Sequence, residues 1–303
     1  MRKCYKKRAF INVNLYADNP SQNYQANRIR QELEALGVST GIGTFAYKIR
    51  INNDGRADAC LPYDFVVNLD KDLYAGETFE KFNIRAFNKI AAISACDDKM
   101  LTHLKLSGLG VKMPRTVAFP LCYNQNAVIT EGDIAPVIDY LGLPVVVKLC
   151  FSSLGKGVFL AKTKEELLTL ANIYKREKAL FQEFISSSEG VDVRIITVGK
   201  KYLCAMKRVS KSDFRSNAAL GGTGESFTPP ESFINVAETV AAALDLDYMG
   251  IDLLFGESGE PIFCEANSNA FFSVMEKVSG VNVAKAYAEY MFKTVYGNSY
   301  GKD

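Results

Sequence analysis

Two carboxylates and a carboxamide stand where they could share one ligand. In the stretch "GIDLLFGESGEPIFCEAN", which ends at Asn267, two apolar runs flank a turn-like segment, as is typical of a β-hairpin. With the turn centred on its Ser-Gly pair, Asp252 lies directly opposite Glu265, and Asn267 points to the same face. Oxygen atoms of these side chains suit Mg²⁺, which fills its remaining positions with water and substrate phosphates. The hairpin therefore indicates a site for a divalent cation.

The same register sorts the other hairpin residues into two faces. The face expected to join a core consists of Ile251, Leu253, Phe255, Ile262, Cys264 and Ala266. The acidic face also pairs Leu254 with Phe263, so it is more than a solvated surface. An ordinary amphipathic hairpin with its charges in water would give a similar pattern, and a slip of one residue would remove it. The metal interpretation therefore needs support from other segments.

Cationic side chains that could bind phosphate precede the hairpin. Lys148 sits in an apolar strand, "VVVKL", where an unpaired ammonium group is costly, so its head should reach an anion in a cleft or extend to solvent. The next loop, "SSLGKGV", has glycines that let backbone N–H groups approach a phosphate. A second cationic series could clamp a phosphate or carboxylate, or form a solvated edge; it consists of Arg194, Lys207, Arg208, Lys211 and Arg215.

The composition disfavours several classes of protein. The chain has 303 residues, of which 48% are hydrophobic, and its 36 Lys and Arg against 34 Asp and Glu leave a net charge of +2. Such a balance indicates a globular protein without a dedicated nucleic-acid or membrane surface. The 7 cysteines are scattered and never form a CxxC pair, which disfavours a zinc site and a disulfide framework. His103 is the one histidine, so we do not expect a Ser/His or Cys/His nucleophile.

The ends and apolar segments of the chain favour a cytoplasmic location. The basic start, "MRKCYKKR", is followed by Asn12 and Asn14 before any long apolar run, so we expect no signal peptide. No apolar segment approaches the length of a membrane span. Free cysteines within apolar runs are also typical of a reducing compartment.

The elements that must position these residues follow an α/β (α+β) pattern. Near the start, the strand "RAFINVNLY" precedes a helix, "SQNYQANRIRQELEALG", for which Ser21 is the expected N-cap. "GIGTFA" matches a loose dinucleotide-binding fingerprint but follows the end of a helix, so we interpret it as a loop. Farther along, helices are predicted over about 97–107, after the cap residue Thr163, and over about 282–296.

The order of the short motifs is more specific than any one of them. From Asp97 onward the chain contains, in succession, "DDK", "VVVK", "SLGKGV", "FQEFI", "GVDVRI", "DFRSN", "GIDLL" and "EAN". This series resembles the ATP-grasp superfamily and, within it, the RimK-like glutamate ligases, a group that includes the LysX-type amino-acid ligases. The resemblance implies an ATP-grasp fold with an N-terminal pre-ATP-grasp α/β domain over 1–96. It also implies a central subdomain over 97–182 and a C-terminal subdomain over 183–303.

The resemblance assigns roles to individual residues. The lysines that would contact the ATP phosphates are Lys99 and Lys148. Glu183 and Phe184 would line the adenine, and Asp192 would bind the ribose. The residues that would approach the terminal phosphate or the activated substrate are Arg215, Ser216 and Asn217, with Arg215 and Asn217 as catalytic groups. The residues that would hold Mg²⁺ are Asp252, Glu265 and Asn267, in agreement with the hairpin geometry.

The implied reaction is the ATP-dependent joining of a carboxylate to an amine through an acylphosphate, with release of ADP. L-glutamate or a related amino acid would be added to an amine or carboxylate acceptor. The implied cofactors are ATP and one or two Mg²⁺ ions, for which Mn²⁺ could substitute. The implied partner is a small amino acid or a peptide tail, with no nucleic acid and no membrane, and the sequence leaves homo-oligomerisation open.

The chain departs from the family after the last motif. RimK-like enzymes usually continue with a Ser-Pro-Gly type turn, whereas this chain has Asn269 and Ala270 followed by Phe271 and Phe272. The resemblance therefore does not identify the acceptor. Three alternatives stay open: an ATP-grasp ligase with a non-glutamate substrate, a pseudoenzyme that binds nucleotide without turnover, and an unrelated α/β protein.

Overall fold

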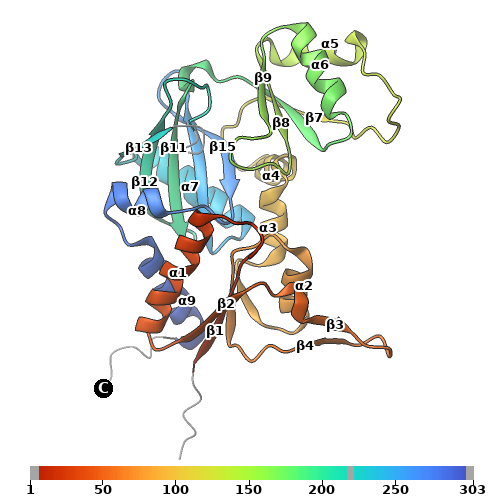
Figure 1. The fold of residues 1–303 in the computed structure, drawn as a ribbon. Helices are drawn as coiled ribbons and strands as arrows, with labels where there is room; N and C mark the ends of the chain where they lie inside the picture. Colours follow the sequence, from red (N-terminus) through yellow and green to blue (C-terminus); the bar gives the residue numbers. More distant parts are fainter. Residues whose placement is uncertain (1–6, 217–221, 298–303) are drawn as a thin grey trace, which may run out of the picture.

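The computed structural model describes residues 7–216 and 222–297 and is built around three sheets (Figure 1). The N-terminal sheet is parallel, with strands in the order β2-β1-β5-β6. Its strands are β1 (Arg8–Asn12), β2 (Ser39–Gly43), β5 (Phe65–Asn68) and β6 (Arg85–Phe87). The expected α/β pattern is confirmed, since each strand is joined to the next through helices or loops on the sheet's faces.

Helices and a short arm surround the N-terminal sheet. They are α1 (Pro20–Ala35), the 3₁₀ turn η1 (Ala46–Lys48), β3 (Ile49–Ile51), β4 (Ala57–Ala59), α2 (Leu73–Lys81) and α3 (Ile90–Asp97). The N-cap of α1 is Asn19, not the expected Ser21, because Pro20 takes the first helical position and Asn19 accepts the next backbone N–H groups. The segment "GIGTFA" was predicted as a loop, but its first three residues end β2, with Gly41 in register with Phe10 of β1, and only the next two residues connect β2 to η1.

The central sheet is antiparallel, in the order β7-β10-β8-β9, and two helices cover its outer face (Figure 1). Its elements are β7 (Thr116–Phe119), α5 (Glu131–Leu141), β8 (Val145–Leu149), β9 (Val158–Ala161), α6 (Lys164–Tyr174) and β10 (Ala179–Glu183). Thr163 caps α6 as expected, accepting the Glu166 N–H at 3.2 Å. The loop 150–157 between β8 and β9 is called the glycine loop below. Helix α4 (Lys99–Leu106), capped by Asp98, lies beneath this sheet.

The C-terminal sheet is also antiparallel, in the order β13-β12-β11-β14-β15. Its elements are the 3₁₀ turn η2 (Ser186–Ser188), β11 (Val191–Val198), β12 (Lys201–Val209), β13 (Thr223–Ser226), α7 (Glu231–Leu244), β14 (Tyr248–Phe255) and β15 (Pro261–Asn267). The chain then forms α8 (Ser273–Ser279) and the predicted terminal helix, α9 (Val283–Tyr296). None of the described helices is both long and apolar enough to cross a membrane.

Helix α9 returns to the start of the chain. Its side chains share one buried core with β1, α1 and β5, and Figure 1 shows α9 beside α1. A second core joins α7 to the inner face of the C-terminal sheet, and a third lies between the central sheet and its two helices. The division of the chain into three segments at 96/97 and 182/183 stays a prediction. Helix α9, the last helix of the third segment, packs against the first segment.

The β14–β15 hairpin has a bulge that the simple register missed. Asp252 does pair with Glu265, as predicted, but Leu253 and not Leu254 faces Phe263. From Leu253 to the turn, each residue of β14 pairs with a β15 residue one position earlier in the chain than expected. Cys264 is the extra residue of the bulge, and beyond it the predicted pairing of Asp252 with Glu265 holds. Phe263 is therefore fully buried in the core, while Cys264 leaves the core face and turns toward Lys148.

Candidate functional site

Two cavities meet between the sheets. A small cavity of about 100 Å³ lies between the central and C-terminal sheets and collects most of the predicted site residues; these are Lys148, Glu183, Phe184, Asp192, Arg215, Ser216, Asp252 and Glu265. A large cavity of about 630 Å³ is bounded by the glycine loop, β15 and loops of the N-terminal sheet, and it takes in Lys99 and Asn267. Arg208 and Glu265 line both cavities, so these two residues mark the junction.

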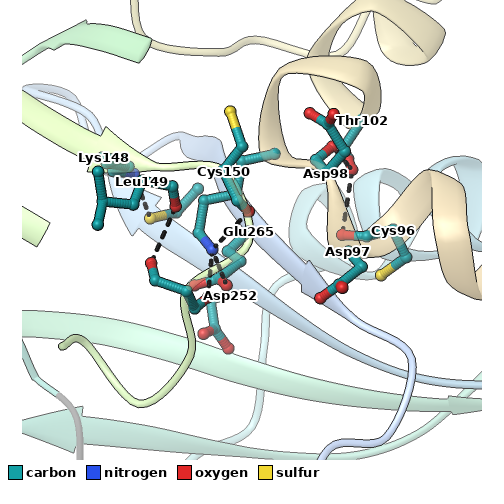
Figure 2. Close-up of polar contacts among 12 residues, drawn as sticks. Cys96, Asp97, Asp98, Thr102, Lys148, Leu149, Cys150, Asp252 and Glu265 are labelled. Atoms are coloured by element: carbon teal, nitrogen blue, oxygen red, sulfur yellow. Dashed lines mark hydrogen bonds and ion pairs between the residues drawn. The ribbon is translucent and has the colours of Figure 1, made fainter. Parts of the chain in front are cut away.

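Lys148 presents a buried ammonium group to the small cavity. Its side chain is 8% exposed, and its Nζ donates to Cys264 Sγ at 3.6 Å (Figure 2). A thiol sulfur is a weak acceptor. No carboxylate within the described residues lies at ion-pair distance from Lys148. A buried cation with so weak a partner is suited to bind an anionic ligand.

Lys99 links the glycine loop to the hairpin. At the start of α4, its Nζ donates to Ser152 O at 2.6 Å and to Cys150 O at 3.3 Å, and it lies 3.3 Å from Glu265 Oε1 (Figure 2). The carbonyl contacts satisfy the ammonium group in the absence of a ligand. The structure therefore places Lys99 on the large-cavity side of Glu265, across from Lys148.

A buried network of hydrogen bonds contacts the backbone of Lys99. His103 Nδ1 lies 2.8 Å from Lys99 O, and its Nε2 lies 3.0 Å from Gln182 Nε2, which also donates to Thr116 Oγ1. A neutral ring with its proton on Nδ1 satisfies both contacts. Burial holds the pKa of His103 at about 4, and the positive charge of Lys148 acts in the same direction. The histidine is thus a structural residue, as its isolation in the sequence suggested.

Charged residues face each other across the C-terminal sheet, in two pairs of opposite charge and one pair of carboxylates. On adjacent strands Arg208 pairs with Asp192, Arg194 with Asp252, and Asp252 with Glu265. Arg194 binds both oxygens of Asp252 at 2.7 Å, and Arg208 Nη2 lies 2.9 Å from Asp252 Oδ2. Burial opposes ionisation of Asp252, but the two guanidinium groups outweigh it and hold its pKa at about 2. This carboxylate is therefore ionised throughout the physiological range.

Asp192 is tied to the sheet. It is buried, and Arg208 donates to both its oxygens, with Nε at 2.7 Å from Oδ1. The predicted contact with a ribose would have to share this carboxylate with Arg208. In the described structure Asp192 positions Arg208 between the two cavities.

The hairpin oxygens fit a hard cation that shares its coordination with phosphate. In residues 7–216 and 222–297, no group of three or more His, Cys, Asp or Glu side chains could hold a metal ion. Asp252 and Glu265 supply two carboxylates, and Asn267 adds a carboxamide. The buried Nδ2 of Asn267 has no hydrogen-bond partner among the described residues. Mg²⁺ takes one or two carboxylates and completes its shell with phosphate and water, so the Glu265 carboxylate and the Asn267 amide oxygen suit it, and Asp252 would share the oxygens that Arg194 and Arg208 bind.

Arg215 clamps the glycine loop to the C-terminal sheet. Its guanidinium group binds Asp213 at 2.7 and 2.9 Å and donates to the backbone oxygens of Gly155 at 2.6 Å and Val158 at 3.1 Å. Ser216, the next residue, is buried and lines the small cavity. Asn217 lies outside the described residues.

The apolar end of the small cavity lies at the end of β10. Arg115 fixes Glu183, with Nη2 at 3.0 Å from Oε1 and its backbone N–H at 3.1 Å from Oε2. The Arg115 hydrogen bond lowers the pKa of Glu183. Phe184 packs edge-on against Phe214, with ring centroids 6.2 Å apart. An aromatic wall beside a backbone strand end suits a flat heterocycle.

The sequence did not identify the N-terminal wall of the large cavity. That wall comes from the loops after β1 and β5 and consists of Asn14, Ala17, Asn19, Ser21, Gln22, Leu69, Asp70 and Lys71. Both loops follow the carboxyl ends of adjacent parallel strands. Ligands commonly bind at that edge of a parallel sheet, but the segments "NLYADNP" and "NLDKD" indicate a site only once β1 and β5 are known to be neighbours.

Known proteins are similar to this chain over most of its length. The profile of the RimK-like ATP-grasp domain matches residues 96–291. Beta-citrylglutamate synthase B of Danio rerio is 35% identical over 227 residues, which are 74% of this chain and 55% of that protein. The chain thus spans little more than half the length of this relative. "Probable alpha-L-glutamate ligase 2" of Hahella chejuensis is 32% identical over 296 residues, which are 97% of this chain and 85% of that protein.

A solved structure is similar over nearly the whole chain. The RimK-domain ATP-grasp protein of Sphaerobacter thermophilus superposes with a TM-score of 0.68 at 18% identity, covering 93% of this chain and 98% of that one. At this identity the likeness speaks for the fold alone. The expected ATP-grasp fold is confirmed.

Proposed function

The chain belongs to the RimK-like ATP-grasp family, and on that premise we propose that it is an ADP-forming ligase that joins a carboxylate to an amine. The γ-phosphate of ATP passes to the carboxylate, giving an acylphosphate and ADP. The amine nitrogen then attacks the acyl carbon, phosphate leaves, and an amide forms with loss of one proton from nitrogen. L-glutamate or a related amino acid is one substrate, and an amine or carboxylate acceptor is the other.

One observation carries the proposal: the small and large cavities touch at Arg208 and Glu265. The small cavity has an aromatic wall and the Lys148 ammonium group, which suit the base and the phosphates of a nucleotide, and its volume of about 100 Å³ means that the two sheets would have to move apart to admit one. The large cavity opens on the other side of the same residues and has the size of a small-metabolite site. A phosphoryl group can therefore be transferred at the junction without either substrate leaving its own cavity.

The chain's own residues supply positioning and charge. Lys148 and Lys99 hold the phosphates from two sides, and Arg215 faces the transferring phosphoryl group once the nucleotide displaces the glycine-loop carbonyls. Phe184 and Glu183 line the adenine, and Asp192 reaches the ribose while positioning Arg208. Ser216 lies beside the phosphates, and Asn217, outside the described residues, stays a predicted catalytic group.

Asp252, Glu265 and Asn267 would hold Mg²⁺, with Mn²⁺ as a substitute and room for a second ion shared with the phosphates. The bound cation would neutralise charge on the β- and γ-phosphates during transfer. Asp252 enters this role already ionised, because Arg194 and Arg208 keep its pKa at about 2. The same arginines fix its orientation, so the carboxylate is in place before the nucleotide arrives.

The closed junction also protects the intermediate. The glycine loop contacts Lys99 through the backbone oxygens of Cys150 and Ser152 and Arg215 through that of Gly155, and Arg215 also binds Val158 O at the start of β9. This cover excludes water from an acylphosphate formed beneath it.

Product analysis tests the proposal. The protein is incubated with Mg²⁺-ATP, L-glutamate and pooled amino acids, carboxylates and small peptides, and ADP, phosphate and the masses of the pool are measured. ADP together with a mass gain of one amide-linked residue is the expected result. AMP and pyrophosphate would contradict the acylphosphate route, and tight ATP binding without turnover would instead indicate a pseudoenzyme.

A further inference from the structure

The large cavity has a wall that the ATP chemistry does not use. Its N-terminal side is formed by the loop after β5, with Asp70 and Lys71, and by the start of α1, with Asn19 and Gln22. These two segments touch, since Gln22 Nε2 donates to Leu69 O at 3.2 Å. The wall belongs to the N-terminal sheet and lies outside the matched domain, 96–291.

The charged groups of this cavity are paired, with one exception. Lys71 forms an ion pair with Asp97, and Lys99 lies 3.3 Å from Glu265. The two remaining cations, Arg194 and Arg208, are held by carboxylates of the C-terminal sheet. Within residues 7–216 and 222–297 no free cation therefore lines this cavity, although a carboxylate does.

That carboxylate is Asp70. It is half-buried, and its Oδ1 accepts the backbone N–H of Lys71 at 2.8 Å. No Lys, Arg or His of the described chain lies within ion-pair distance of it. Burial raises the pKa of Asp70, and the nearby charge of Asp72 adds to the effect. A carboxylate in this position lacks a positive partner, which a ligand can supply.

The neighbouring groups suit the other end of an amino acid. The first turn of α1, a helix of 16 residues, lies beside Asp70 through the Gln22–Leu69 contact. Asn19 already accepts the first backbone N–H groups of α1, so only the side-chain N–H groups of Asn19 and Gln22 are left to donate to a carboxylate there. An α-ammonium and an α-carboxylate are separated by one carbon atom, so one amino acid can reach both groups.

We propose that Asp70 binds the α-ammonium group of the amino-acid substrate, whose α-carboxylate faces the side-chain amides of Asn19 and Gln22. This inference rests on the proposed function for the identity of the amino acid, L-glutamate, and it assigns the large cavity to that substrate. Asp70 acts as a positioning residue: it holds the ammonium form on entry and orients the nitrogen toward the junction at Glu265. The opposite wall, with Asn267, remains for the acylphosphate.

Calorimetry with two matched ligands tests the inference. L-glutamate and L-2-hydroxyglutarate carry the same carboxylates and differ in an ammonium or hydroxyl group at the α-carbon. Both are titrated into the protein saturated with Mg²⁺ and a non-hydrolysable ATP analogue. The wild-type protein should bind L-glutamate at least about tenfold more tightly, since a hydrogen bond between charged groups contributes that much. Equal dissociation constants, or no binding of L-glutamate, would overturn the proposal.

Variants at neighbouring aspartates locate the contact. Asp70→Asn should weaken L-glutamate binding about tenfold or more and leave that of L-2-hydroxyglutarate unchanged. Asp72→Asn removes the same charge two residues away and keeps the N-cap of α2, because Asn also accepts the Tyr74 N–H, so it should preserve the preference. Loss of the preference in Asp72→Asn but not in Asp70→Asn would refute the assignment.

A hydroxylamine trap separates this inference from the proposed function. Hydroxylamine intercepts an acylphosphate as a hydroxamate without the amine substrate. Hydroxamate formation is measured in the wild-type protein, and the KM for L-glutamate in amide formation should be about tenfold higher in Asp70→Asn than in Asp72→Asn. A wild-type protein that forms no hydroxamate but prefers L-glutamate in calorimetry would refute the ligase and keep the Asp70 site. Hydroxamate formation by the wild-type protein, together with an unchanged KM for L-glutamate in Asp70→Asn, would refute the Asp70 site and keep the ligase.

Discussion

The small and large cavities are built from different kinds of chain. The walls of the small cavity are largely strands of two antiparallel sheets, in which register alone places Lys148, Asp192 and Asp252. The N-terminal wall of the large cavity is made of loops that meet only after the parallel sheet has formed. The groups proposed to bind phosphate can thus be inferred from local alternation along a strand, whereas those proposed to select a substrate depend on which loops become neighbours.

The electrostatics of the two cavities differ in the same way. The small cavity contains a buried lysine whose nearest partner is a thiol, so it is prepared for an anion. The large cavity contains Asp70, a carboxylate without a cation in the described chain, so it is prepared for a positive group. Arg208 and Glu265 belong to both, and changes there should affect both ligands.

The largest effect is expected from Asp252→Ala. From the sequence alone, this change would remove metal-dependent turnover and spare the fold. The structure alters that expectation, because Arg194 and Arg208 would be left partly buried without this carboxylate. We expect loss of turnover and a decrease of about 3–5 kcal/mol in the free energy of unfolding, measured by urea denaturation. Asp54→Ala, at an exposed pair with Arg56, should change it by less than about 0.5 kcal/mol.

Glu265→Gln tests whether the two cavities really share a residue. Gln keeps the shape and can still accept from Lys99, so the fold should survive. The kcat for ADP formation should fall about 10²–10³-fold, as when one preorganised charge contact is removed from a transition state. The KM values for ATP and for L-glutamate should both rise. A change in only one of the two KM values would contradict the proposal that both cavities share Glu265.

Acid should weaken the support beneath Lys99. Burial lowers the folded-state pKa of His103 from 6.5 to about 4, so between these values the unfolded chain takes up a proton that the folded chain does not. As the pH is lowered from 6.5 to 4, the free energy of unfolding should therefore decrease by about 1.4 kcal/mol per pH unit, or about 3 kcal/mol in all. His103→Gln removes this titration, and urea denaturation of both proteins at each pH should show a flatter profile for the variant. Parallel profiles would contradict the buried neutral ring.

The smallest expected effect separates the cavities most cleanly. Lys148→Met keeps the volume of the side chain and removes the ammonium group that faces Cys264. The dissociation constant of a non-hydrolysable ATP analogue should rise about ten- to a hundredfold, and that of L-glutamate should stay within about twofold. Asp70→Asn should give the opposite pattern. Equal effects of Lys148→Met on both ligands would show that the cavities are not separate.

Several site residues were predictable because they lie on regular strands. The pairing of Asp252 with Glu265 follows from counting outward from the turn, and the structure has that pair. The same counting failed for Phe263 and Cys264, since a bulge shifts the register and exchanges their faces. A bulge depends on how the core accepts an aromatic side chain, and alternation along one strand carries no such information.

Other parts of the site had no local signal. Asp192 and Arg194 were visible as a motif, but that Arg208 would bind Asp192 and also contact Asp252 depends on the order of β12, β11 and β14 in the sheet. Asp70 was indistinguishable from other acidic loop residues, because its lack of a cationic partner exists only where three segments meet.

The sequence by itself determined several of the helices and strands and the chemistry that the strands present. Periodicity and capping are properties of neighbouring residues, so they survive without knowledge of the fold. The tertiary structure alone decided which charges are already neutralised and which are left for a ligand. Lys148 and Asp70 are left for a ligand because nothing of opposite charge in the described chain packs against them, while Arg208 and Asp252 have their partners across the sheet. Such pairing is set by distances between segments remote in the chain, and burial then makes it strong.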